Sequence, residues 1–142
     1  MNLKNAKLYS IITIVLVAVT SFLGLVVFIT SFSRMQQIIA EHGLDYVMEN
    51  LMAISQEISG QIGALSTLNT LLGIAAFVFT ILTVIEANKL KENRTPFILL
   101  IVGIFIDILA IIGAVLLLLE IKKIEQTPPP APTDNYLDNQ NF

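Results

Sequence analysis

Three long apolar stretches, separated by short charged segments, dominate the pattern of hydrophobic and polar positions along the chain. The first stretch, Leu8 to Ser33, carries no charge, and the third has Asp107 as its one charged residue before Glu120. Because an α-helix rises 1.5 Å per residue, about 20 apolar residues span the hydrocarbon core of a bilayer. The pattern therefore predicts an all-α integral membrane protein with three transmembrane helices, over about 8–32, 64–86 and 96–120.

The first stretch has a signal peptide as its alternative interpretation, since Lys4 and Lys7 give the chain a basic start. A signal peptide has an apolar core of only about 7–15 residues, followed by small residues at its cleavage site. The stretch here is longer and ends in Thr30–Arg34 without such a site. We therefore expect an uncleaved membrane anchor.

Residues 34–63 differ from the apolar stretches because they mix charged residues with apolar ones at helical spacing. Gly43 follows His42 as a helix end would, and Asp45 is placed to cap the next helix. The pattern predicts an extramembrane helical hairpin, in which the first helix runs to about residue 42 and the chain then returns. The alternative is a helix lying on the membrane surface. The apolar face of the returning helix is formed by Val47, Leu51, Ile54, Ile58, Ile62 and Leu65.

Composition supports a membrane protein and removes several function classes. Charged residues make up 13% of the chain, against about 25% in soluble domains. Eight Lys and Arg stand against 11 Asp and Glu, which excludes nucleic-acid binding by charge. Cysteine is absent, His42 is the single histidine, and no catalytic or phosphate-binding motif occurs. We expect no enzyme activity, no cofactor and no metal; the cluster of Glu41, His42 and Asp45 is too weak a signal for a metal site.

The domain boundary is predicted near residue 125, where composition changes. Residues 1–125 form the predicted membrane domain, and 126–142 form a Pro-rich tail that we expect to be disordered. Lys and Arg favour the cytoplasmic side of membranes. With three spans, five of them flank the side of the N-terminus and three flank the other side. This bias predicts a multi-pass protein of the cell membrane with a cytoplasmic N-terminus and an extracytoplasmic hairpin and tail.

Small and polar residues recur at steps of three and four in each predicted span, which is how membrane helices pack closely and hydrogen-bond to one another. We interpret these stripes as the contact surfaces of a three-helix bundle; a polar conduit along the same seam is the alternative. The residues expected to make intramembrane polar contacts or interactions are Asp107, Thr20, Ser21, Asn69 and Thr80. Those expected to allow close helix packing are Gly24, Gly73, Gly103 and Ala110.

Asp107 is the most informative of these residues, because it lies near the middle of the third predicted span. A carboxylate at that depth costs several kcal/mol unless it is neutral or paired. No Lys, Arg or His lies within any predicted span to pair with it. We expect a neutral Asp107 that hydrogen-bonds to Thr20, Ser21 or a partner subunit. It serves either as polar glue between helices or as a proton or cation site.

The segments Gly73–Ala76, Glu86–Lys91 and Ile111–Ala114 resemble those of small uncharacterised multi-span membrane proteins of Gram-positive bacteria. The resemblance implies a bacterial cell-membrane protein and transfers no site residues. In that group the third apolar region is usually longer and can hold two spans, whereas residues 94–120 here hold one.

The function predicted from these features is a non-enzymatic accessory or assembly subunit. It would lie in the lipid bilayer and bind another membrane protein, or itself as a homo-oligomer, through its helices and hairpin. Two alternatives come from other classes. One is a small oligomeric pore or holin-like protein with Asp107 in a polar seam, and the other is a membrane immunity protein.

Overall fold

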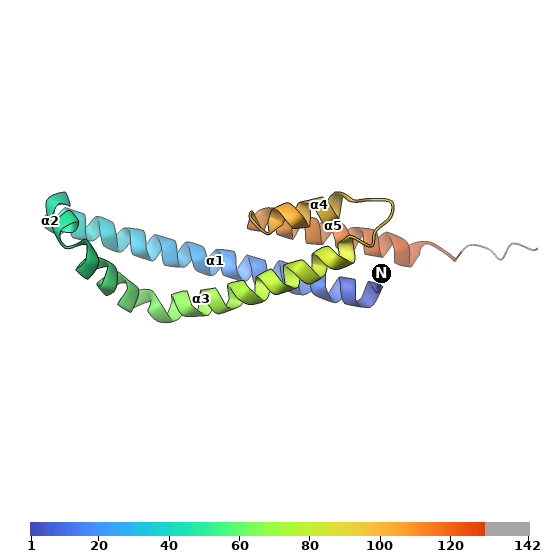
Figure 1. The fold of residues 1–142 in the computed structure, drawn as a ribbon, viewed down its shortest axis with the longest axis horizontal. Coiled ribbons are helices and arrows are strands. Elements are labelled where there is room, and N and C mark those ends of the chain that lie inside the picture. Colours follow the sequence, from blue (N-terminus) through green and yellow to red (C-terminus); the bar gives the residue numbers. More distant parts are fainter. Residues whose placement is uncertain (130–142) are drawn as a thin grey trace, which may run out of the picture.

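The computed structural model describes residues 1–129, and all regular structure within them is helical (Figure 1). The all-α class predicted from the sequence is therefore confirmed. Residues 130–142, and with them most of the predicted Pro-rich tail, lie outside the described part of the chain. The helices in chain order are α1 (Leu3–His42), α2 (Leu44–Glu49), α3 (Leu51–Ala87), α4 (Thr95–Gly103) and α5 (Asp107–Gln126).

Helices α1 and α3 are the two long elements, with 40 and 37 residues, and they lie side by side along most of their length (Figure 1). Within residues 1–129, these are the two helices that are long and apolar enough to cross a membrane. α1 ends at His42, as predicted, because Gly43 adopts a φ of 85°, which favours glycine. Asp45 does not cap α2 as expected; it lies within the first turn of that helix.

The prediction of one continuous helix over 96–120 is wrong. The chain instead leaves α4 after Gly103, turns through Ile104–Ile106, and returns as α5 beginning at Asp107. α4 and α5 lie side by side in Figure 1, and their backbones approach very closely. A Cβ atom on Gly103 would lie 2.8 Å from the Cβ of Ala110 and nearer still to its backbone. A Cβ on Gly113 would lie 2.9 Å from the backbone nitrogen of Leu100. Two glycines, one on each helix, therefore make the reversal possible.

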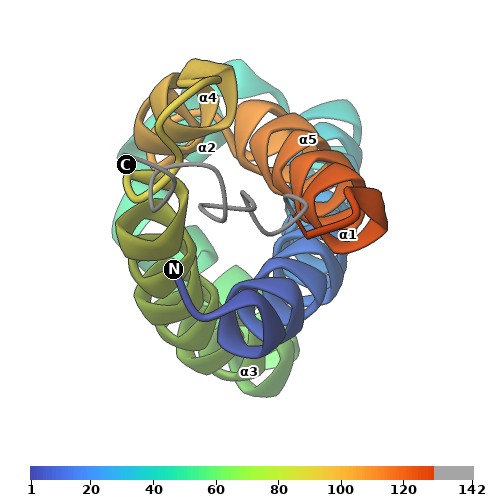
Figure 2. The ribbon, with the colours of Figure 1, turned by 90° about the vertical axis from the view of Figure 1, so that its right-hand side faces the viewer.

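The start of α1, the end of α3, and helices α4 and α5 meet at one end of the molecule, which we call the four-helix end. Figure 2 looks from this end and shows the order α1, α3, α4, α5 around the bundle. An ion pair of 3.6 Å joins Lys7 to Glu125, so the start of α1 and the end of α5 lie together. The shared apolar core here is the four-helix cluster: Ala6, Ala87, Leu90, Leu100, Ala114, Leu117 and Ile121.

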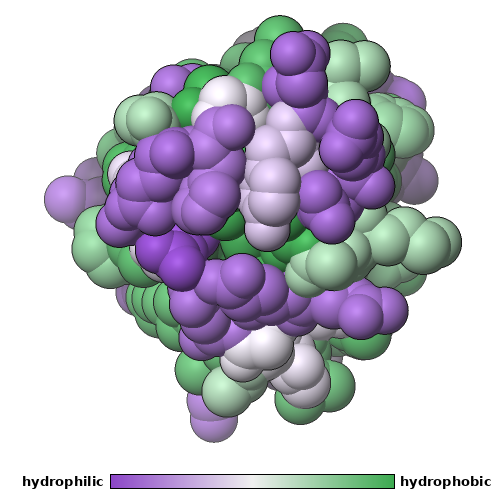
Figure 3. Space-filling view, turned by 90° about the vertical axis from the view of Figure 1, so that its left-hand side faces the viewer, coloured by the Kyte–Doolittle hydropathy of each residue, from purple (hydrophilic) through white to green (hydrophobic). Residues whose placement is uncertain are grey.

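The opposite end of the molecule, around α2, has its own small core. We call it the distal cluster; it consists of Ile38, Val47, Ile54 and Ile58, with Met35, Ile39 and Ile62 packed against it. Leu51, which the periodicity assigned to the same face, is 58% exposed. The chain kinks between α2 and α3 at Asn50, and this kink moves Leu51 out of the packed face. Figure 3 looks onto this end and shows many hydrophilic residues there.

Candidate mid-helix polar pocket

A pocket of about 660 Å³ opens between α1 and α3 where the α4–α5 turn ends. α1 and α3 continue past the turn without α4 or α5 beside them (Figure 1), so the turn forms one wall of the pocket. The residues that line it share a mixture of small, polar and apolar side chains: Val17, Thr20, Ser21, Gly24, Leu25, Phe28, Asn69, Gly73, Ala76, Phe77, Thr80, Gly103, Ile104 and Asp107.

The carboxylate of Asp107 is the one ionisable group in this lining. It is the first residue of α5, and its Oδ2 accepts a hydrogen bond of 2.9 Å from the hydroxyl of Ser21 on α1. Ser21 lies 14 residues after Lys7 and 13 residues before Arg34, the two charges that flank the apolar stretch of α1. At 1.5 Å per residue, the carboxylate is thus about 20 Å from each charged boundary. Asp107 therefore occupies the middle of an otherwise uncharged band.

The two threonine hydroxyls of the pocket donate to the backbone of their own helices. The hydroxyl of Thr20 donates to the backbone oxygens of Leu16 and Val17, and that of Thr80 donates to the backbone oxygen of Ala76. Their oxygen lone pairs remain free to accept. The Oδ1 atom of Asn69 is buried and has no hydrogen-bond partner among residues 1–129. Within the described part of the chain, the pocket therefore holds one buried acceptor without a partner beside the Asp107 carboxylate.

The structure brings together eight of the nine residues that sequence analysis singled out. All five of the predicted polar residues and three of the four predicted packing residues line the pocket. Ala110 does not; it is buried in a small cluster with Val17 and Ala76 one turn further along. Of the two partners expected for Asp107 within the chain, Ser21 bonds to it and Thr20 does not.

Between the pocket and the four-helix end, the polar stripes of α1 and α3 face each other. Thr13 and Thr83 are fully buried and share a hydrogen bond of 2.9 Å across the two helices. The Thr83 hydroxyl also donates to the backbone oxygen of Phe79 at 2.8 Å, so Thr13 is the donor between the two threonines and is satisfied within the apolar core. Helices α1 and α3 are therefore packed together at Thr13 and Thr83, and the pocket lies on the distal side of this contact.

Sequence reasoning missed the wall that the α4–α5 turn contributes. Gly103 and Asp107 are a helix-stop and a helix-start residue four positions apart, which is a turn signal. The three residues between them are Ile, Phe and Ile, and their hydropathy hides that signal. The apolar wall of Leu25, Phe28 and Phe77 also went unpredicted, because only the fold shows which large side chains face the pocket.

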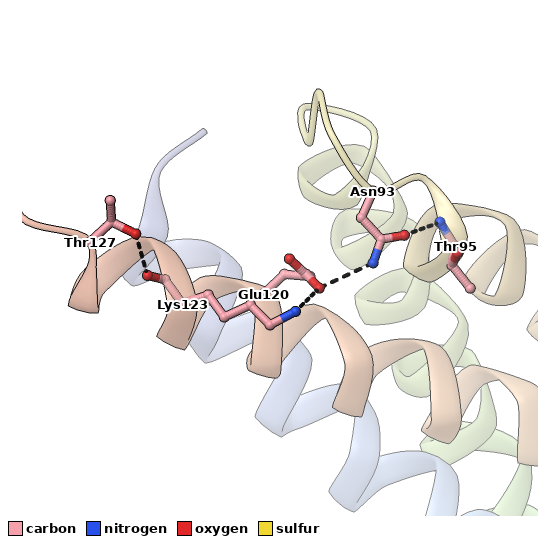
Figure 4. A network of polar contacts seen from close by, with 5 residues as sticks. All are labelled: Asn93, Thr95, Glu120, Lys123 and Thr127. Carbon is pink, nitrogen blue, oxygen red and sulfur yellow. Dashed lines mark hydrogen bonds and ion pairs between the residues drawn. The ribbon is translucent and has the colours of Figure 1, made fainter. Parts of the chain in front are cut away.

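Ion pairs and hydrogen bonds lie at both ends of the uncharged band. On the distal side, Arg34 donates to Glu57 at 2.7 Å, and this hydrogen bond raises the pKa of Arg34. At the four-helix end, Glu120 accepts hydrogen bonds from Lys123 at 2.8 Å and from Asn93 at 3.1 Å (Figure 4). The bond from Lys123, followed by that from Asn93, lowers the pKa of Glu120. This network ties the loop before α4 to α5.

The acidic residues around His42 do not form a metal centre. The imidazole of His42 stacks on the ring of Tyr46, with centroids 4.6 Å apart. Within residues 1–129, no group of three His, Asp or Glu side chains lies close enough to hold a metal ion. We take the mid-helix pocket as the candidate site because it gathers the polar residues that the sequence singled out.

No protein-family model, curated protein or solved structure matches this chain.

Proposed function

We propose that this protein is a non-enzymatic accessory subunit of a bacterial cell membrane that binds another membrane protein. In this proposal α1 and α3 cross the bilayer, and the α4–α5 pair enters it from the four-helix end and turns back at its middle. The third predicted span thus becomes a re-entrant helical hairpin.

Exposed apolar surface supports a membrane location. In the most apolar windows of α1 and α3, only 11% and 17% of the residues are buried. A core helix of a soluble protein would be mostly buried, and a soluble surface cannot expose so many large apolar side chains. The most exposed on α1 include Phe22, Phe28 and Phe32, at 55–66%. The bilayer is the solvent that such a surface requires.

Charge distribution supports the re-entrant arrangement and its orientation. If α4 and α5 return to the four-helix end, seven of the eight Lys and Arg residues flank that side, and Arg34 alone flanks the distal side. With three full spans the division was five to three. A bias of this size favours a cytoplasmic four-helix end. The distal end would then form the extracytoplasmic hairpin.

This arrangement changes the predicted position of the C-terminal tail. Three spans would place it opposite the N-terminus, but the pair of Lys7 and Glu125 joins the start of α1 to the end of α5. We therefore propose that Thr127 and the N-terminus lie on the same, cytoplasmic side. Breaks in helices at membrane depth are tolerated where protein or a cavity surrounds them, and here the turn lines the pocket.

The observation that carries the accessory role is the incomplete bundle. α4 and α5 cover α1 and α3 over half of the uncharged band and stop at Asp107, which leaves a pocket beside the exposed turn residue Phe105. A partner helix lying against α1 and α3 in the other half would complete a bundle there.

Purification in mild detergent from the native host tests this proposal. We expect a stoichiometric membrane-protein partner that stays bound through size-exclusion chromatography. A large homo-oligomer without any other protein would instead support the pore alternative and would refute the accessory role.

A further inference from the structure

We propose that the mid-helix pocket receives a Lys or Arg side chain from a transmembrane helix of the partner protein. The inference rests on the accessory function proposed above and specifies the chemistry of that partner. It follows from three properties of the pocket: its acceptors, its depth in the uncharged band, and its open wall.

The pocket contains one charged group, the Asp107 carboxylate, and one buried acceptor without a partner among residues 1–129, the Oδ1 of Asn69. Asp107 is exposed on the open side of the pocket, where its Oδ2 accepts a hydrogen bond from Ser21. The hydroxyl hydrogens of Thr20 and Thr80 are engaged by their own helix backbones. A buried acceptor without a donor costs about 1–3 kcal/mol. A hydrogen-bond donor would satisfy the Oδ1 of Asn69, and beside the Asp107 carboxylate a cationic donor is favoured.

The chain itself cannot supply that cation. No Lys, Arg or His lies between Lys7 and Arg34 on α1, between Glu57 and Glu86 on α3, or between Arg94 and Glu120. A second copy, placed at the same depth, would bring another Asp107 and no cation. A complementary basic side chain must therefore come from a different protein.

The open wall admits a helix. Gly73 lines the pocket on α3, and a Cβ atom there would meet nothing within 4 Å. Small residues let helix backbones approach closely in membranes. With a pocket volume of about 660 Å³, there is room for a long basic side chain beside such a helix. Opposite charges buried at this depth stabilise each other, since neither is solvated by lipid.

The test uses synthetic transmembrane peptides of about 24 residues built from Leu and Ala. One carries a single central Lys and the other a central Leu. Binding to the full-length protein in phosphatidylcholine vesicles is followed by energy transfer between fluorophores. We expect the Lys peptide to bind at least about tenfold more tightly than the Leu peptide. Asp107→Asn should abolish the difference, whereas Ser31→Ala, outside the pocket, should preserve it.

Each other outcome overturns the inference. Equal binding of both peptides, no binding of either, or unchanged Lys-peptide binding by Asp107→Asn would show that the pocket does not select a basic side chain. Stabilisation by sodium over choline that depends on Asp107 would assign the pocket to a free cation instead. If the native partner still co-purifies with Asp107→Asn, this inference fails while the accessory function stands. Loss of every partner from the wild type refutes the function itself.

Discussion

Replacing Gly103 with Ala is expected to separate α4 from α5 and to destabilise the protein. A Cβ atom at this position would overlap the backbone of Ala110, and backbone cannot rotate away as a flexible side chain can. Overpacking of this kind costs about 1–3 kcal/mol. Because the α4–α5 turn also walls the pocket, the loss should extend to partner binding.

The matched control for this variant is Gly73→Ala. Gly73 is helical, lies in the same uncharged band and has nothing within 4 Å of an added Cβ. Alanine stabilises a helix relative to glycine by about 1 kcal/mol. The melting temperature of Gly73→Ala in detergent should therefore be unchanged or slightly higher than that of the wild type. Equal melting temperatures for wild type and Gly103→Ala would contradict the close packing of α4 on α5.

Replacing Ile54 with Asp should have the largest effect at the distal end. Ile54 is 4% exposed within the distal cluster, where a carboxylate would lose its hydration without gaining a partner. Burying an unpaired charge lowers the free energy of unfolding by about 4 kcal/mol or more. We expect the contact between α2 and the end of α1 to be lost, which limited proteolysis near Gly43 would detect.

Leu51 provides the control three residues earlier on the same helix. Since it is 58% exposed, Leu51→Asp should change the unfolding free energy by no more than about 0.5 kcal/mol. If both Asp variants behave alike, the distal cluster does not pack as described.

Much of this architecture was accessible from the sequence. The uncharged stretches locate α1 and α3, and the pair His42–Gly43 fixes the end of α1. Small and polar residues at helical spacing point to eight of the residues that line the pocket. This worked because the cost of polar groups in an apolar environment leaves them few positions other than helix contacts.

The reversal at residues 104–106 was not accessible, because hydropathy measures how apolar a segment is and not its direction. A span of 25 residues and a hairpin of the same composition have the same profile. The deciding contact, Gly103 against Ala110, joins residues seven apart that one straight helix would place on nearly the same face. The prediction that Leu51 lies on the packed face was wrong for a related reason. The periodicity assumed a continuous helix through Asn50, where the structure has a kink.

Accessibility of single cysteines to an impermeant reagent tests the proposed re-entrant hairpin most directly. The natural chain has no cysteine, so Asp45→Cys, Glu92→Cys and Thr127→Cys each introduce one exposed thiol. With an impermeant maleimide on intact cells, Asp45→Cys should be labelled, whereas Glu92→Cys and Thr127→Cys should react only after permeabilisation. Labelling of Thr127→Cys from outside while Glu92→Cys stays protected would mean that residues 96–120 cross the whole membrane, and would contradict the account.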